Sequence, residues 1–379
     1  MPIQERTIVD LREEIALAAL DRRKTISGVA AEFDVSRPTV RLWRDRYRAE
    51  GREGLVDRSH APHSCPHRTA EEIEQLVIAE RAQWGWGSKK ILQRLEERYP
   101  DMDFPKRATI DAILARHDLV NRRPRRSKPR TPFVRRYETN EPGELTTIDF
   151  KGQFKLGNGR YCYPLTMVDS ASRFLLACQG LSSTRFGPAW RVVERIFREH
   201  GLPRAMQSDN GAPFGPLSGK FSALSVRLMT LDIQPVFSRP ARPSDNGRHE
   251  RMHRDLKREA TLPPSAGFQP QQKRFDNFQR IYNEERPHEG IGMQRPARLY
   301  RPSTRPFPRQ IAKPQYDRHF EVRKVSSAGQ ISWRDRLIRI SEVFAGHHVG
   351  LEPIDDALWA VHFYRFKIGD LDERNNEFF

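Results

Sequence analysis

Apolar residues recur every three or four positions near the N-terminus, which indicates amphipathic helices. Residues 25–47 contain a short apolar helix, a turn, and a second helix for which Ser36 is the expected N-terminal cap. One face of the second helix carries the side chains that we expect in a core, namely Val40, Trp43 and Tyr47. Two helices joined by a tight turn are typical of a helix-turn-helix unit, so the pattern predicts such a DNA-binding domain in residues 1–60.

A second unit of the same kind is predicted in residues 68–120. The apolar positions that mark its two helices are Ile91, Leu92 and Leu95 in the first and Ile110, Ile113 and Leu114 in the second. Two helix-turn-helix units in tandem would span a longer DNA site than one.

Further along, the helical period gives way to alternation typical of strands. Residues 141–302 open with three strand-like segments and then alternate helix and strand, with a helix near 187–200 and a short strand near 204–208. This order predicts a mixed sheet flanked by helices. In residues 315–370, five short alternating segments separated by turns predict a small β-barrel, and the last residues, 369–379, are predicted to be a frayed acidic tail.

Composition narrows the class of protein. The chain has 379 residues, which predicts about two to four domains. Its 66 Lys and Arg exceed 49 Asp and Glu, and a net charge of +17 favours a polyanionic partner, because each neutralised phosphate releases counterions. It lacks an apolar run of about 18 residues, so no membrane span is predicted. The charged first residues argue against a secretory signal, and the three cysteines show no paired spacing, so we expect a cytoplasmic protein.

Basic and hydroxyl side chains gather where the predicted helices would meet DNA. The candidate contacts are Arg37, Thr39, Arg41, Arg44 and Arg48 in the first unit and Lys106, Arg107 and Thr109 in the second. Residues 121–140 are predicted to be a basic linker that follows a phosphate backbone, since like charges without an apolar core stay extended. Its candidate contacts are Arg122, Arg123, Arg125, Arg126, Lys128 and Arg130. A targeting signal is the alternative interpretation of this segment.

Metal-ligating residue types also occur between the two helical units. They are His60, His63, Cys65 and His67. Zinc is one interpretation, but the spacing matches no common finger, because alternate residues of an extended segment point apart. A proline-containing linker is the favoured interpretation.

Three acidic residues stand at predicted ends of strands and helices. Asp149 ends a strand, Asp209 follows a short strand and precedes an Asn-Gly turn, and Glu250 begins a helix. Phosphoryl transfer on DNA can use two divalent cations about 3.5–4 Å apart, and Mg²⁺ takes hard oxygen ligands such as carboxylates. The three residues are therefore candidates for a metal-dependent phosphoryl-transfer site.

Four motifs carry a resemblance to a known family. They are TTIDFKG at 146–152, QSDNGAPF at 207–214, and the segments 239–259 and 282–300. In this order they resemble the DDE transposase and retroviral-integrase superfamily, specifically bacterial insertion-sequence transposases with an integrase core. The resemblance covers most of residues 141–300, and the paired helix-turn-helix units upstream are similar to the N-terminal region of that family.

The resemblance implies an RNase H-like α/β core with two Mg²⁺ or Mn²⁺ ions per active site. Asp149 would bridge both ions, Asp209 would bind one and Glu250 the other. The family hydrolyses phosphodiester bonds at terminal inverted repeats and then uses the freed 3′ hydroxyl to attack target DNA, without a covalent protein–DNA intermediate. The implied partners are double-stranded DNA and further copies of the chain, as a dimer or tetramer assembled on DNA, without a membrane. The implied location is the bacterial nucleoid.

The third acidic ligand departs from the usual spacing of this family. Thirty-five residues, the usual number, lie between Asp209 and Asp245, whereas 40 lie between Asp209 and Glu250. Pro240, Pro243, Gly247 and Glu250, however, reproduce the Pro-x-x-Pro-x-x-x-Gly-x-x-Glu run of the family. We therefore predict Glu250 and keep Asp245 as its rival.

Other polar residues receive roles outside the acidic triad. The helix of Glu250 carries residues predicted to contact DNA phosphates, namely His249, Arg251, His253, Arg254 and Lys257. Asp169 is interpreted as a hairpin-turn residue. His288 belongs to a motif that the family retains, and either braces the core or contacts DNA.

The sequence thus predicts a multidomain α+β chain: two N-terminal helix-turn-helix domains, an RNase H-like core and a C-terminal SH3-like β-barrel, the last by resemblance. Two other functions remain open. A non-catalytic DNA-binding regulator would use the helix-turn-helix units but would not need the three acids, all of which are present. An RNase H-like nuclease or resolvase without strand transfer is harder to distinguish from a transposase by sequence, although tandem helix-turn-helix units suit recognition of DNA ends.

Overall fold

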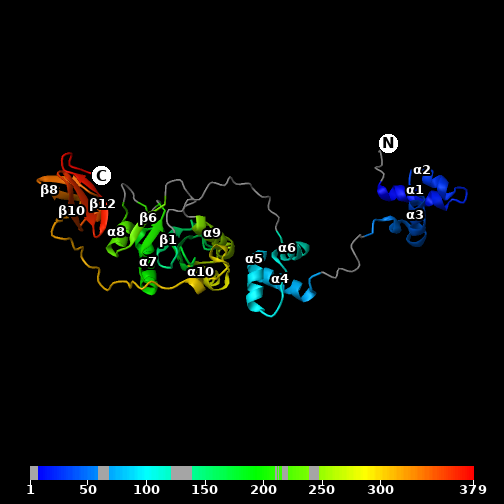
Figure 1. The fold of residues 1–379 in the computed structure, drawn as a ribbon, viewed down its shortest axis with the longest axis horizontal. Helices are drawn as coiled ribbons and strands as arrows, with labels where there is room; N and C mark the ends of the chain where they lie inside the picture. The colour runs from blue at the N-terminus through cyan, green and yellow to red at the C-terminus, as the bar shows by residue number, and fades with distance from the viewer. Residues whose placement is uncertain are drawn as a thin grey trace. The chain divides into compact units, whose positions relative to one another are not determined.

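The computed structural model describes residues 7–58, 68–120, 139–209, 211, 213–215, 221–238 and 247–379 (Figure 1). The basic residues from Arg122 to Arg130, the His/Cys cluster at 60–67 and Asp245 lie outside the described residues. The chain divides into two compact units, residues 1–70 and residues 71–379. Among the described residues, no helix combines the length and the apolar character that crossing a bilayer requires.

The first unit is a bundle of three helices: α1 (Ile8–Leu20), α2 (Ile26–Glu32) and α3 (Arg37–Glu50), followed by a 3₁₀ turn, Gly51–Leu55. Thr25 caps α2, and Ser36 caps α3 by accepting from the amide of Thr39 at 3.3 Å, which confirms the predicted cap. Val29 and Val40 are fully buried between the helices. The two predicted helices are therefore present, and α1 is an additional one that supplies their packing surface.

The second unit begins with another three-helix bundle, formed by α4 (Glu71–Trp84), α5 (Ser88–Arg98) and α6 (Arg107–Arg116). Its core contains the apolar positions predicted from helical spacing together with one from α4, namely Val77, Ile91, Leu95, Ile110, Ile113 and Leu114. Lys106, Arg107 and Thr109 are exposed at the start of α6.

A mixed six-stranded sheet follows, made of β1 (Leu145–Phe150), β2 (Phe154–Lys155), β3 (Tyr161–Asp169), β4 (Leu175–Leu181), β5 (Ala205–Ser208) and β6 (Gln234–Phe237). The strand order is β2-β3-β1-β5-β6, and β4 pairs with β3. The first strands pair antiparallel, whereas β1, β5 and β6 run parallel. This arrangement confirms the predicted mixed sheet.

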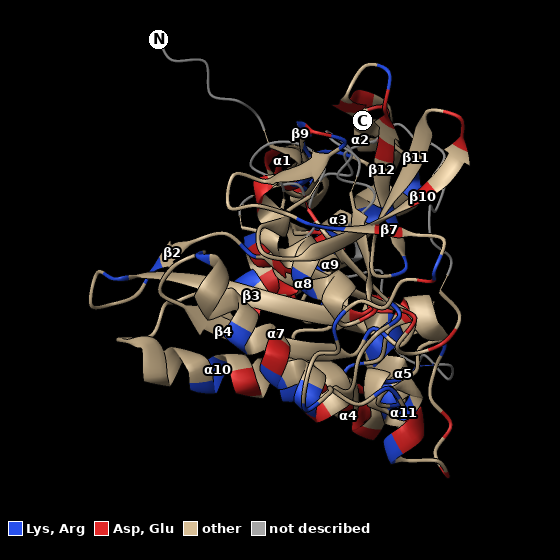
Figure 2. Cartoon of the chain, turned by 90° about the vertical axis from the view of Figure 1, so that its left-hand side faces the viewer, with Lys and Arg blue, Asp and Glu red and all other residues tan. Residues whose placement is uncertain are grey.

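Helices cover the sheet because its strands bury apolar residues on both faces. On one side, Ile148 and Met167 pack against α7 (Phe186–His200) and α8 (Ala223–Thr230). On the other, Leu175 and Cys178 pack against α9 (Gly247–Leu256) and α10 (Phe268–Arg280). The outer faces of α7 and α10 carry acidic and basic positions together (Figure 2). Neither helix therefore presents the single-sign stripe expected of a DNA-binding face.

Short helical turns continue from α9 and α10 and complete the core. They are η3 (Lys257–Thr261), η4 (Ile281–Glu285), η5 (Glu289–Ile291) and α11 (Pro296–Leu299).

The C-terminal part is rich in strands: β7 (Glu321–Lys324), β8 (Gln330–Trp333), β9 (Arg336–Arg339), β10 (His348–Asp355), β11 (Leu358–Phe363), β12 (Phe366–Asp372) and β13 (Glu377–Phe378), with a 3₁₀ turn, η6 (Glu342–Phe344). Five strands form a sheet in the order β13-β12-β11-β10-β7, and β8 and β9 form a hairpin. Val226 and Met229 of α8 join the apolar core of this part.

The predicted frayed acidic tail is wrong. Residues 366–372 form β12, which pairs with β11, and Leu371 is fully buried and pairs with Phe378. The charged residues lie between buried apolar positions, and a register shift in the pairing with β11 interrupts their alternation, so the density of charge concealed the strand. The signal was the apolar series Phe366, Ile368 and Leu371.

Candidate active site

The topology of the sheet brings two predicted acids to the same edge. Asp149 lies near the end of β1, and Asp209 follows directly after β5. Because β1 and β5 are parallel neighbours, their C-terminal ends meet, and polar residues at these ends share one rim of the sheet. Glu250 lies in the first turn of α9, the helix that packs on this sheet.

The charges of these residues act on one another. Burial and, to a smaller extent, the charges of Asp209 and Glu250 together raise the pKa of Asp149 to about 7. Burial also raises the pKa of Asp209, opposed by a backbone hydrogen bond from Gly211. Mutual repulsion of desolvated carboxylates is relieved by a cation that they share. The oxygen ligands of this set fit a hard divalent cation such as Mg²⁺ or Mn²⁺.

Gly211 makes room for Asp209. A Cβ atom at Gly211 would lie 2.9 Å from Asp209 Oδ2, a separation that requires one of them to move. The predicted Asn-Gly turn therefore has a steric reason for its glycine, although Asn210 lies outside the described residues.

Two buried histidines of α9 lie close to Asp149. His249 and His253 are 2% and 7% exposed, so the prediction that they contact DNA phosphates is wrong. They share the buried face of α9 with Met252 and Leu256, at spacings of three and four residues, whereas Glu250, Arg251 and Arg254 are exposed. Burial lowers the pKa of His249 to about 3 and that of His253 to about 2, so both imidazoles are neutral near pH 7.

The histidines are held by threonine hydroxyls. Thr166 Oγ1 lies 2.6 Å from His249 Nε2 and 2.8 Å from His253 Nε2, and it donates to the backbone oxygen of Asp149 at 3.0 Å. Thr147 Oγ1 lies 3.0 Å from His249 Nδ1. One potential ligand atom from each of Asp149, His249 and His253 falls within 4.8 Å of the others. Sequence reasoning missed this cluster.

The exposed side of α9 carries the other predicted contacts. Arg251, Arg254 and Lys257 are exposed there, next to Glu250. In the first unit, Arg37, Arg41 and Arg48 are exposed on α3, while Thr39 and Arg44 are half-buried, and Arg44 forms an ion pair with Asp45.

His288 is half-buried and packs against Tyr282. Its Nε2 lies 3.2 Å from the backbone oxygen of Tyr282, and its ring centroid lies 4.5 Å from that of Tyr282. Burial lowers the pKa of His288 to about 3.

The neighbouring Arg286, which sequence reasoning did not single out, is 1% exposed and forms ion pairs with Asp255 and Glu259. Its position in the retained motif was the available signal.

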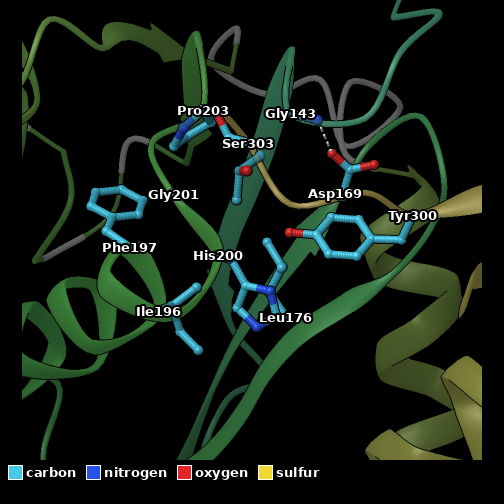
Figure 3. A pocket seen from close by; sticks show the side chains of 11 residues that line it. Gly143, Asp169, Leu176, Ile196, Phe197, His200, Gly201, Pro203, Tyr300 and Ser303 are labelled. Carbon is cyan, nitrogen blue, oxygen red and sulfur yellow. Dashed lines mark hydrogen bonds between the residues drawn. The ribbon is translucent and has the colours of Figure 1, made fainter. Parts of the chain in front are cut away.

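Asp169 lies at the opposite end of the sheet, in the hairpin turn that was predicted for it. It accepts from the backbone amide of Gly143 at 2.8 Å (Figure 3). It also accepts from the backbone amide of Ser172 at 2.9 Å. The adjoining cavity, which Tyr300 and His200 also line, holds about 10 Å³, the space of about one water molecule. It is formed near the N-terminal ends of β1 and β5, away from Asp149 and Asp209.

Family models match most of the described chain. Two integrase core domain models match residues 139–243 and 231–296. A helix-turn-helix domain matches residues 11–63, and a homeodomain-like domain matches residues 39–114. The C-terminal domain of the IS481 family of transposases matches residues 320–378.

Curated relatives and solved structures were also found. The Pol polyprotein of feline endogenous virus ECE1 is 30% identical over 49% of this chain, and the Gag-Pol polyprotein of baboon endogenous virus (strain M7) is 29% identical over 46%. This chain spans only 17% and 10% of their respective lengths.

Among solved structures, the HTLV-2 integrase catalytic core in complex with magnesium (trimeric form) is 14% identical, with a TM-score of 0.34 over 42% of this chain and 97% of that one. A simian T-cell lymphotropic virus intasome is 13% identical, with a TM-score of 0.36 over 76% of this chain and 97% of that one. With two integrase core matches and a transposase C-terminal match in order along the sequence, this chain belongs to the DDE transposase and retroviral-integrase superfamily.

Proposed function

We propose that this chain is a DNA transposase that cuts at the terminal inverted repeats of a mobile element and joins the freed 3′ hydroxyl to target DNA. The observation that carries the proposal is the electrostatic coupling of three acids from separate elements: Asp209 and Glu250 both raise the pKa of Asp149. An isolated carboxylate at a strand end would not show this coupling. Carboxylates gathered in this way at functional sites commonly serve as metal ligands or in acid–base chemistry.

In this proposal Asp149, Asp209 and Glu250 hold Mg²⁺ or Mn²⁺, two ions per site. When bound, such cations activate the attacking hydroxyl and stabilise the leaving oxygen of an in-line displacement. The ends of β1 and β5 and the first turn of α9 would hold these three carboxylates on packed elements, which would limit the reorganisation needed at the moment of reaction. Arg251, Arg254 and Lys257 would bind backbone phosphates beside them.

The helical domains would bind the element ends. On α3, Arg37, Arg41 and Arg48 are exposed at spacings of four and seven residues, which places them along one helix face suited to a major groove. Lys106, Arg107 and Thr109 are exposed at the start of α6, in the second bundle. The basic linker, residues 121–140, would follow the backbone between this bundle and the core.

The remaining parts would assemble the complex. The strand-rich C-terminal part, residues 315–370 extended to β13, would act as an SH3-like domain that contacts DNA or another copy of the chain. Pairing two DNA ends needs at least two active sites, so we propose a dimer or tetramer assembled on DNA.

The test uses purified protein, DNA that carries an element end, and Mg²⁺ or Mn²⁺. Asp149→Asn, Asp209→Asn and Glu250→Gln should each lose cleavage and strand transfer by more than the roughly 10- to 100-fold typical of residues that only support a metal ligand. End binding, measured in EDTA by mobility shift, should remain within about twofold of the unmodified protein, because the helical domains are intact.

Asp245→Asn is the matched control for the third ligand. It removes the rival carboxylate and should retain cleavage, because Glu250 supplies the ligand. An inactive Asp245→Asn together with an active Glu250→Gln would overturn the assignment of Glu250. Full activity of all three triad variants would overturn the proposed function.

A further inference from the structure

The hydroxyl of Thr166 sets the protonation of both buried histidines. It donates to the backbone oxygen of Asp149 at 3.0 Å. A hydroxyl has one hydrogen, so its contacts with His249 Nε2 and His253 Nε2 must be hydrogen bonds that it accepts. Each neutral imidazole then carries its hydrogen on Nε2 and a lone pair on Nδ1.

The two Nδ1 lone pairs meet different surroundings. His249 Nδ1 lies 3.0 Å from Thr147 Oγ1, whose single hydrogen it shares with the backbone oxygen of Val168 at 3.3 Å. His253 Nδ1 instead faces Asp149 Oδ2, at 3.8 Å. Both of these atoms are acceptors, and their separation is too long for a hydrogen bond. Two atoms that each bind the same cation at about 2.0–2.2 Å lie no more than about 4.4 Å apart, so this pair has the spacing of ligands to one ion.

The position of His253 on α9 agrees with this geometry. Glu250 and His253 are three residues apart, so they are neighbours along one side of the helix. A Glu-x-x-His pair on one helix is a known way to present a carboxylate and an imidazole to the same metal centre. The Nε2–H of a metal-bound imidazole ordinarily donates to a fixed acceptor, and here Thr166 Oγ1 is that acceptor at 2.8 Å.

We infer that His253 Nδ1 is a further ligand of the cation held by Asp149, while His249 only positions Thr166. This inference rests on the proposed function and adds a nitrogen to its all-carboxylate ligand set. An imidazole ligand favours transition-metal ions over Mg²⁺, which prefers oxygen. The centre should therefore bind Mn²⁺ more tightly than Mg²⁺.

The test adds Mn²⁺ alone to the full-length protein and measures electron spin-echo modulation, which detects nitrogen bound directly to the ion. Mn²⁺ in the unmodified protein should show coupling to one histidine nitrogen. Protein grown with ¹⁵N-histidine should shift that coupling to the ¹⁵N pattern, which identifies the nitrogen without a mutation.

His253→Asn removes the imidazole and should abolish the nitrogen coupling. It should also raise the Kd for Mn²⁺ by about 10-fold, with a smaller change for Mg²⁺. His348→Asn, at an exposed histidine that begins β10, is the matched control and should keep both the coupling and the Kd. Circular dichroism of each variant checks the fold.

The outcomes separate the two proposals. Mn²⁺ bound without histidine nitrogen in the unmodified protein, or coupling that persists in His253→Asn, would overturn the role of His253 alone. Mn²⁺ binding that is absent, or unchanged in Asp149→Asn, would instead overturn the proposed metal-dependent function.

Discussion

Asp149 illustrates how a proposed catalytic position trades stability for chemistry. Its pKa is about 7 in the folded chain, raised by burial and by two neighbouring acids, against an ordinary value of 3.8. Between these values the folded state holds a proton that the unfolded chain has lost. Its stabilising contribution is therefore complete below about pH 4 and is lost as the pH rises through about 7.

Asp149→Asn should accordingly stabilise the metal-free protein at high pH. In EDTA at pH 8, the variant should unfold at a temperature about 2 °C or more above that of the unmodified protein. This difference in unfolding temperature should become smaller as the pH falls towards 5. Thermal unfolding followed by circular dichroism across this range measures the difference. Asp111→Asn, at an exposed carboxylate of α6, is the control and should follow the unmodified protein. Parallel pH curves for Asp149→Asn and the unmodified protein would contradict the expectation.

At the scale of elements, the helical turn that extends α9 is tied to the motif after the last acid. Arg286 Nη2 donates to both carboxylate oxygens of Glu259, at 2.6 and 2.5 Å, and its Nη1 donates to Asp255. Asp255 lies on α9 five residues after Glu250, so Arg286 fixes the helix that carries the proposed third ligand.

Arg286→Met should destabilise the core by about 2 kcal/mol or more. It removes the buried cation of Asp255 and Glu259 and leaves them only the exposed Arg258, and because both carboxylates are partly exposed the cost should fall below the roughly 3–5 kcal/mol of a fully buried pair. Urea unfolding measures this change in the free energy of unfolding. Arg195→Met breaks an exposed ion pair with Glu199 on α7 and should cost less than about 0.5 kcal/mol. Equal costs for the two variants would show that Arg286 has no bracing role.

Elements with a regular period were predictable from the sequence, whereas burial across elements was not. Ser36 before an amphipathic helix predicted α3, and alternation predicted β1 and β3, because these signals are local. The buried side of α9 was also marked, by Met252 and Leu256, but its many charges favoured the interpretation of a DNA-binding face. The partners of its histidines, Thr147 and Thr166, lie about a hundred residues away in sequence, and no local pattern indicates them.

At the scale of the second unit, the second helical bundle rests on the core through α5. Arg94 donates to the carboxylate of Glu285 at 2.7 Å, and Lys89 pairs with Glu289 at 3.1 Å. Glu97 pairs with Arg295 and, at 3.4 Å, with Arg298. These partners lie in η4, η5 and α11 or directly beside them, within the motif that the family retains. The exposed start of α6 takes no part in these contacts, so docking through α5 leaves the proposed DNA-reading residues accessible.

Reversing the charge of Glu97 should therefore weaken the contact between α5 and the core, and exchanging the charges of Glu97 and Arg295 should restore it. Glu97→Arg places like charges beside Arg295 and Arg298, and we expect amide hydrogen exchange in residues 289–299 to rise about fivefold or more, measured by mass spectrometry. Adding Arg295→Glu recreates an opposite pair and should return exchange close to its original rate. Glu96→Arg, at the exposed neighbouring position, makes the same charge change away from this contact and should leave exchange unaltered. If Glu97→Arg left exchange unchanged, or if Glu96→Arg raised it equally, α5 would not be held on the core by these ion pairs.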